Sequence, residues 1–266
     1  MIDISKIDYS TLDRPEILKY LFHPRTEWAS PRDATPGQEI FIPVEDDFVI
    51  GGRFHMTTKS AASILFFHGN GEIVSDYDEM GPLYNRMGIN FLPVDYRGYG
   101  RSTGTPTITA MMRDCHVIFD FVGRWLKENS YSGQLIIMGR SLGSASVLEL
   151  AASYPDLIDA LIIESGFAYV EPLLQLLGIN PDDLDFKEEA GFRNVDKIRK
   201  FTRPALIIHA EYDHIIPFSD GQALYDACQS REKTFLKIPK ANHNDIFRHG
   251  ASEYLSAVKR LVQKTI

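Results

Sequence analysis

The sequence places one serine between two glycines where its local pattern changes. Residues 139–143 read Gly-Arg-Ser-Leu-Gly; they close the apolar run 134–139 and lead into a helical pattern. Where a strand turns at once into a helix, small neighbours relieve crowding and the residue at the apex adopts an uncommon backbone conformation. Its side chain then stands at the helix amino terminus, where free N–H groups gather. This arrangement predicts that Ser141 is a nucleophile.

A serine hydroxyl needs a base to take its proton and an acid to orient that base. After a turn of this kind, the acid and then the histidine follow in loops beyond later strands. Asp213 comes shortly after the apolar run 205–210, and His243 comes shortly after the run 234–239. The order predicts that Ser141 attacks, His243 takes the proton and Asp213 fixes the imidazole.

Other acids compete for the orienting role. Glu211 lies nearer the end of its strand than Asp213 does. Glu164 ends the strand that follows the serine turn, and Asp245 is two residues from His243. We favour Asp213 because its loop position and its place in the chain order both fit.

Attack on a carbonyl creates an oxyanion, which needs preorganised N–H donors. One donor is predicted to be the backbone N–H of Leu142, directly after the nucleophile. The second should come from the His-Gly-Asn-Gly-Glu stretch at 68–72, which follows an apolar run. We assign it to the backbone N–H of Asn70, with Gly71 as the alternative.

The elements that would position these residues form an alternating pattern. Short apolar runs separated by helical patterns predict a doubly wound α/β fold whose mostly parallel sheet is covered on both faces. Residues 38–57 alternate apolar and polar positions, which predicts an antiparallel hairpin before that sheet. We expect one domain over residues 1–266, with an amino-terminal arm at 1–37 that contains a short helix at 15–22. The predicted strands are 63–68, 89–94, 134–139, 158–164, 205–210 and 234–239.

About forty residues separate the strands that end at Glu164 and begin at Ala205, more than one crossover helix needs. We expect a small cap insertion at 166–192 and a crossover helix at 195–201. Ligands of open α/β sheets bind at the carboxyl edge of the strands, so the insertion should border the site. Its Phe167, Tyr169 and Leu173 are candidates to bind substrate, although such residues also pack onto the body of a fold. Arg140 could contact an acidic group of a substrate or form a salt bridge.

Composition restricts the partners. The net charge of −8 argues against nucleic-acid binding, which requires clustered Lys and Arg. Cys115 and Cys228 are far apart in no metal-binding spacing, so we predict no metal and a reducing environment. No apolar run suits a signal peptide or a membrane span. We therefore expect a cytoplasmic protein without stable membrane insertion, and the oligomeric state stays open.

Ser141, Asp213, His243 and the stretch 68–71 together resemble the α/β-hydrolase superfamily. Residues 95–102, Asp-Tyr-Arg-Gly-Tyr-Gly-Arg-Ser, are similar to a stretch that commonly follows the fourth strand there. The resemblance runs from about residue 38 to the end. It implies an eight-stranded, mostly parallel sheet and serine hydrolase chemistry that needs no cofactor, with the polar residues of 95–102 stabilising loops.

The short-capped, esterase- and thioesterase-like members of that superfamily fit best. Thioesterases of this group that act on acylated proteins carry an amino-terminal cysteine cluster or a membrane anchor, and this sequence shows neither. We expect cleavage of carboxylic esters of small or medium, fairly apolar acyl groups; thioesters and lipid-like esters share that chemistry. Amidase or peptidase activity, acyl transfer, and a non-catalytic binding role are the alternatives.

Overall fold

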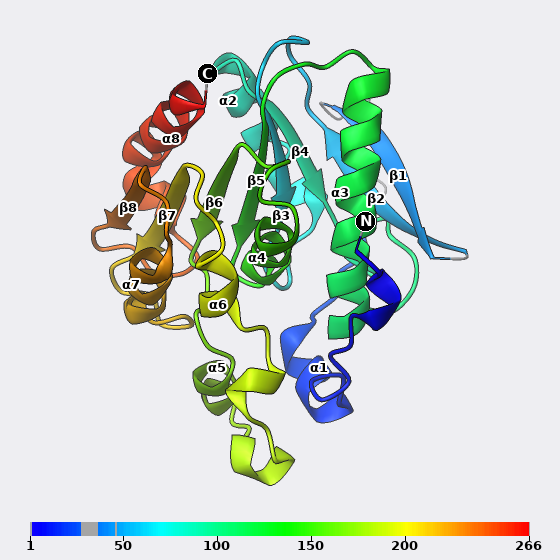
Figure 1. Ribbon diagram of the computed structural model, residues 1–266, viewed down its shortest axis with the longest axis vertical. Helices are drawn as coiled ribbons and strands as arrows, with labels where there is room; N and C mark the ends of the chain where they lie inside the picture. Colours follow the sequence, from blue (N-terminus) through cyan, green and yellow to red (C-terminus); the bar gives the residue numbers. More distant parts are fainter. Residues whose placement is uncertain (1, 28–36, 46, 266) are drawn as a thin grey trace.

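The computed structural model describes residues 2–27, 37–45 and 47–265 (Figure 1). Within these residues, eight strands form one sheet in the order β1-β2-β4-β3-β5-β6-β7-β8. The expected doubly wound α/β fold, opened by an antiparallel hairpin, is confirmed. Residues 28–36 of the expected arm lie outside the described residues. The strands are β1 (Gln38–Glu45), β2 (Phe48–Phe54), β3 (Ser63–Phe67), β4 (Asn90–Val94), β5 (Leu135–Arg140), β6 (Ala160–Glu164), β7 (Ala205–Ala210) and β8 (Lys233–Ile238).

Strand directions follow the sequence patterns. β1 and β2 form the antiparallel hairpin, and β2 also runs antiparallel to β4. All pairings from β4 through β3 to β8 are parallel. The strands β3, β4, β6 and β7 are buried at every position because helices cover both faces of the sheet. β8 lies at the sheet edge and is only partly buried.

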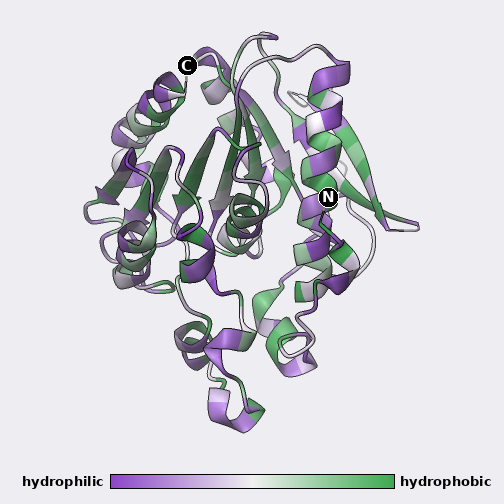
Figure 2. Ribbon diagram, in the orientation of Figure 1, coloured by the Kyte–Doolittle hydropathy of each residue, from purple (hydrophilic) through white to green (hydrophobic). Residues whose placement is uncertain are grey.

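Helices cover the two faces unequally (Figure 1). α3, α4, α6 and α7 pack over one core, whereas α2 and α8 pack over the other. Figure 2 shows the apolar strands between helices whose outer surfaces are hydrophilic. The helices are α1 (Pro15–Leu21), α2 (Met80–Arg86), α3 (Ile108–Glu128), α4 (Gly143–Ser153), α5 (Glu171–Leu176), α6 (Asn194–Ile198), α7 (Phe218–Ala227) and α8 (Ile246–Lys264), with 3-10 turns η1 (Ile4–Lys6), η2 (Val74–Tyr77), η3 (Pro181–Leu184) and η4 (Glu188–Ala190).

The helix expected at 195–201 is shorter than its sequence pattern. α6 ends at Ile198, and the amide of Phe201 closes a tight turn on the Ile198 carbonyl. The side chain of Phe201, whose amide closes this turn, is fully buried. None of the helices in the described part of the chain is long and apolar enough to cross a membrane.

Two short segments flank the carboxyl edge of the parallel strands. The segment 166–192 leaves β6 at this edge and contains α5, η3 and η4. The arm carrying α1 reaches the same edge (Figure 1), where the side-chain amide of Asn70 donates to the carbonyl of Tyr20 at 3.3 Å. Any ligand at this edge therefore lies near both segments.

A buried ion pair joins α4 to α6 and to the arm. Lys197 Nζ lies 2.6 Å from Glu149 Oε2 and donates to the Tyr9 hydroxyl at 3.0 Å. Burial raises the pKa of Glu149, but the hydrogen bond with His116 and the charge of Lys197 outweigh it and lower that pKa to about 2. Glu149 is therefore ionised in the fold at all but strongly acidic pH.

Replacing Glu149 with Gln should lower the free energy of unfolding at neutral pH by about 3 kcal/mol, because Lys197 loses its buried counter-ion. The folded-state pKa of Glu149 lies below its ordinary 4.5, so the stabilisation is present above pH 4.5 and is lost as pH falls toward 2. Urea denaturation of both proteins should therefore show a difference that shrinks with acidification.

The matched control is Asp120→Asn, which removes an exposed ion pair with Arg124 on α3. This control should change the free energy of unfolding by less than about 0.5 kcal/mol. A Glu149→Gln deficit that stays constant from neutral pH to about pH 3 would contradict the assignment.

Candidate active site

Ser141 occupies a strained turn between β5 and α4. Its φ of +51° lies in the left-handed region, which costs a non-glycine residue on the order of 1–3 kcal/mol. Glycine is required on both sides of Ser141 because neither position has room for a Cβ atom. A Cβ at Gly139 would lie 2.3 Å from the Gly143 carbonyl oxygen, and one at Gly143 would lie 2.1 Å from the Phe67 carbonyl oxygen. The local sequence thus permits a turn that side chains would block.

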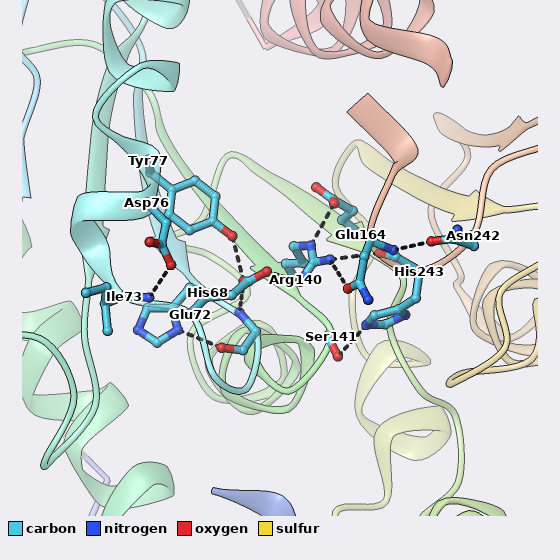
Figure 3. A network of polar contacts seen from close by, with 12 residues as sticks. His68, Glu72, Ile73, Asp76, Tyr77, Arg140, Ser141, Glu164, Asn242 and His243 are labelled. Carbon is cyan, nitrogen blue, oxygen red and sulfur yellow. Dashed lines mark hydrogen bonds and ion pairs between the residues drawn. The ribbon is translucent and has the colours of Figure 1, made fainter. Parts of the chain in front are cut away.

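The structure brings Ser141, His243 and Asp213 into one hydrogen-bonded series. His243 Nε2 lies 3.0 Å from Ser141 Oγ (Figure 3), and His243 Nδ1 lies 2.8 Å from Asp213 Oδ2. Because a carboxylate only accepts, His243 Nδ1 carries the hydrogen and Nε2 accepts from the serine hydroxyl. The amides of Ile215 and Ile216 donate to the other oxygen of Asp213, at 3.0 and 2.8 Å.

These contacts determine the charge of Asp213. Burial raises the pKa of its carboxyl, but the hydrogen bond and charge of His243 and the two backbone amides outweigh it. The pKa of Asp213 therefore lies below its ordinary value, and the group is a carboxylate at neutral pH. A second histidine, His209, is fully buried beside it and bonds the Ile216 carbonyl through Nε2 at 2.9 Å. Burial lowers the pKa of His209, which keeps it neutral.

The competing acids bond elsewhere. Glu164 holds Arg140 Nε at 3.1 Å and accepts from the Tyr254 hydroxyl at 2.7 Å. Glu211 pairs with Lys237 at 2.9 Å. Asp245 accepts from the backbone and side-chain amides of Asn242 at 2.6 and 2.8 Å. Of the acids that the sequence left open, Asp213 is the one that the structure places on His243.

The loops expected to supply N–H donors lie at the same edge. Leu142 is the N-cap residue of α4, and Asn70 lies in the loop after β3. Among the described residues, the backbone N–H groups of Leu142 and Asn70 donate to no protein acceptor. The Gly69 amide, by contrast, is engaged with Glu72 Oε2 at 2.7 Å. Two of the amides in these loops thus stay available for a ligand.

The side chain of Asn70 is fixed by the arm. Its Oδ1 accepts from the backbone amide of His23 and from the Tyr99 hydroxyl, both at 2.8 Å. Its Nδ2 faces His23 Nδ1 at 2.9 Å. No local sequence pattern indicates this contact, because residue 23 is far from residue 70 along the chain.

The candidate substrate residues divide into two groups. Phe167 and Leu173 border a cavity of about 290 Å³ between α5 and the segment that carries Asp213. Tyr169 is 41% exposed and does not line it. Phe167 also packs edge-on against Phe192, with the ring centroids 5.4 Å apart. Further lining residues are Pro172, Gln175, Leu176, His214, Ile215, Ile216, Pro217 and Asp220.

Arg140 forms salt bridges with two carboxylates. Figure 3 shows it between Glu72 and Glu164, and its Nη2 donates to the His243 carbonyl at 2.8 Å. Sequence reasoning offered the salt bridge as an alternative but missed Glu72 as a partner. Among the described residues, no group of three or more His, Cys, Asp or Glu side chains is arranged to hold a metal.

Comparisons with known proteins show which family the chain is similar to. Residues 58–181 match a family model described as serine aminopeptidase, S33. A human protein named alpha/beta hydrolase domain-containing protein 17B is 34% identical over 213 residues, which cover 77% of this chain and 67% of that protein. The mouse protein 17C of the same name is 30% identical over 249 residues, covering 90% of this chain and 72% of that protein.

Solved structures share the fold at low identity. A Pyrococcus furiosus esterase, Pf2001, aligns with a TM-score of 0.71 at 18% identity, covering 91% of this chain and 98% of that one. Est1E from Butyrivibrio proteoclasticus with bound ferulic acid aligns with a TM-score of 0.68 at 20% identity, covering 85% and 98%.

Asp213→Asn should slow the labelling of the protein by a fluorophosphonate probe on the order of 10⁴-fold, because the imidazole loses the partner that fixes its tautomer. The control is Glu211→Gln, which alters the competing acid on the same segment and should leave the labelling rate unchanged. A time course of labelling, quenched at intervals and measured by mass spectrometry of the intact protein, gives both rates. Equal rates for the two variants would refute the role of Asp213.

Proposed function

The chain belongs to the α/β-hydrolase superfamily, and we propose that it is a serine hydrolase that cleaves carboxylic esters. The observation that carries the proposal is the hydrogen-bonded series from Ser141 through His243 to Asp213, with distances of 3.0 and 2.8 Å. Its members come from three separate loops, and Ser141 has a strained backbone conformation of the kind that clusters at active sites.

In the first half of the reaction, Ser141 Oγ attacks the ester carbonyl carbon while His243 Nε2 takes the hydroxyl proton. The resulting imidazolium is stabilised by the Asp213 carboxylate. The carbonyl oxygen becomes an oxyanion, for which the free N–H groups of Leu142 and Asn70 are the proposed donors. The tetrahedral species then expels the alcohol, which receives its proton from His243, and an acyl-serine is left.

Water completes the cycle. His243 Nε2 takes a proton from the water as its oxygen attacks the acyl carbon, and the same donors hold the second oxyanion. Collapse releases the carboxylic acid and returns the proton to Ser141 Oγ. Each step uses residues of this chain, and acyl transfer would differ only in replacing water with another acceptor.

The proposed acyl site is the cavity bordered by Phe167 and Leu173. Its mostly apolar lining favours an uncharged acyl group, and its volume of about 290 Å³ suits a small or medium one. Thioesters fit the same chemistry because the acyl carbon is attacked in the same way. Two structural neighbours are named as an esterase and a monoacylglycerol lipase, which supports an ester rather than another bond.

One observation favours a second candidate, an amidase or peptidase. The family model that matches residues 58–181 is described as a serine aminopeptidase. The attack on the carbonyl would be unchanged, but the leaving amine must be protonated by His243 before it departs. The two candidates therefore differ in the substrate and not in the residues.

Ser141→Ala should reduce the turnover of an aryl ester by about 10⁵- to 10⁶-fold, because no acyl-enzyme can form. The matched control is Ser146→Ala, which removes a serine hydroxyl from α4, the helix that follows Ser141. The buried hydroxyl of Ser146 has no hydrogen-bond partner among the described residues, so its removal should leave turnover unchanged. Turnover by Ser141→Ala at the wild-type rate would reject the proposed function.

Aryl esters of increasing acyl length should be hydrolysed faster than the matching aryl amides, with a maximum in kcat/KM at short or medium chains. The reason is that a cavity of about 290 Å³ leaves no room for a long chain without exposing it. Steady-state kinetics over both series measure the preference. Faster cleavage of the amides would favour the peptidase candidate instead.

A further inference from the structure

Arg140 connects three segments of the site, although its own side chain does not reach Ser141 Oγ. Its Nε donates to Glu164 at 3.1 Å, and its Nη1 pairs with Glu72. Its Nη2 donates to the His243 carbonyl at 2.8 Å and approaches Asn244 Oδ1 at 3.4 Å. One buried guanidinium thus contacts the end of β6, the loop after β3 and the loop after β8 (Figure 3).

Glu72 carries the connection into the loop that contains Asn70. While one carboxylate oxygen pairs with Arg140, the other accepts from the Gly69 amide and from the Tyr77 hydroxyl, both at 2.7 Å. Gly69 directly precedes Asn70, the proposed oxyanion donor. A Cβ at Gly69 would lie 2.7 Å from Arg140 Nη1, which shows how closely the guanidinium packs on this loop.

Glu164 carries the connection to the nucleophile. Its carboxylate bonds Arg140 and the Tyr254 hydroxyl, and its backbone carbonyl accepts from the Ser141 amide at 2.8 Å. Arg140 and Glu164 are also direct neighbours across the β5–β6 pairing. The turn that holds Ser141 is therefore fixed to the same residues that hold the two flanking loops.

The charges make this arrangement specific. Arg140 and both carboxylates are largely buried, so each depends on the others for compensation. Burial raises the pKa of Glu72, but the charge of Arg140 and the Tyr77 hydroxyl outweigh it and leave the pKa below its ordinary value. Glu72 is therefore ionised at neutral pH, as the connection requires.

The loops have room to move if this connection is cut. Glu72, Arg140, Glu164 and His243 all border a cavity of about 250 Å³. Close packing alone therefore does not hold His243 on this side. Displacement by about 1 Å can cost about 100-fold in rate when reacting groups must meet in a fixed geometry.

We propose that Glu72 and Arg140 form a positioning clamp that holds the Asn70 loop and the His243 loop in register around Ser141. The inference rests on the proposed function and extends it to residues that do not touch the substrate. The clamp acts through a backbone amide at one end and a backbone carbonyl at the other. Breaking the clamp should lower kcat and leave KM nearly unchanged, because the clamp aligns reacting groups and does not bind the acyl chain.

The test compares Arg140→Lys with Arg97→Lys in the full chain. Arg97 is a matched control because it is similarly buried and holds Asp114 and Glu45 at 2.7 to 2.9 Å, with no bond to either loop of the clamp. A lysine keeps the charge, but its single nitrogen cannot take the three separate places that Arg140 Nε, Nη1 and Nη2 occupy beside their partners. Arg140→Lys should lower kcat for an aryl ester by about 100-fold with KM nearly unchanged, whereas Arg97→Lys should affect only thermal stability.

Glu72→Gln should lower kcat in the same way, and the double variant Glu72→Gln/Arg140→Lys should lose much less than the product of the two single losses. Non-additivity of this kind is expected when both changes break one connection. Fully multiplicative losses, or an Arg140→Lys variant with the kcat of Arg97→Lys, would overturn the clamp.

A proton NMR measurement separates failure of the clamp from failure of the proposed function. The hydrogen on His243 Nδ1, bonded to Asp213, should give a far-downfield signal whether or not the protein cleaves esters. The signal should persist in Arg97→Lys and broaden or vanish in Arg140→Lys. If the wild-type protein had no esterase activity but Arg140→Lys still broadened or removed the signal, the function would be rejected and the clamp kept. An unchanged signal in Arg140→Lys would reject the clamp.

Discussion

The site depends on a lack of space at the junction of β5 and α4. The chain must turn there with its backbone pressed against β3 and against its own next turn, so positions 139 and 143 cannot carry a Cβ. Ser141, between them, is held at positive φ by hydrogen bonds from the surrounding sheet and helix. This constraint places the hydroxyl at the carboxyl edge of the sheet before any substrate binds. Every other residue of the site is arranged around that fixed point.

Buried charges then divide into two systems that meet at His243. On one side, Asp213 contacts the imidazole ring and sets its tautomer. On the other, Arg140 contacts the backbone of the same residue and, through Glu72, the loop of Asn70. The first system controls where the proton sits, and the second controls where the ring sits. A base needs both, because proton transfer depends on distance as well as on charge.

The sequence predicted the strands and the members of the candidate site because these depend on local patterns. Most of the predicted parallel strands are apolar runs buried on both faces, although the edge strand β8 is only partly buried. Ser141, Asp213 and His243 follow strand ends in an order that the topology brings together. Contacts between distant segments were not predictable in this way. Nothing near Glu72 marks Arg140 as its partner, and the hold of His23 on Asn70 joins the arm to a loop that shares no local pattern with it. Tyr169 lies outside the cavity because position along an insertion does not determine which side chains face inward.

If Ser141 is an activated nucleophile, a probe that reacts with such serines should bind covalently there, and the position of the adduct can be measured. The protein can be treated with one equivalent of a fluorophosphonate, digested, and mapped by tandem mass spectrometry. We expect a single adduct on the peptide containing Gly-Arg-Ser-Leu-Gly, with the added mass on Ser141. An adduct on another residue, or no adduct while aryl-ester turnover continues, would contradict it.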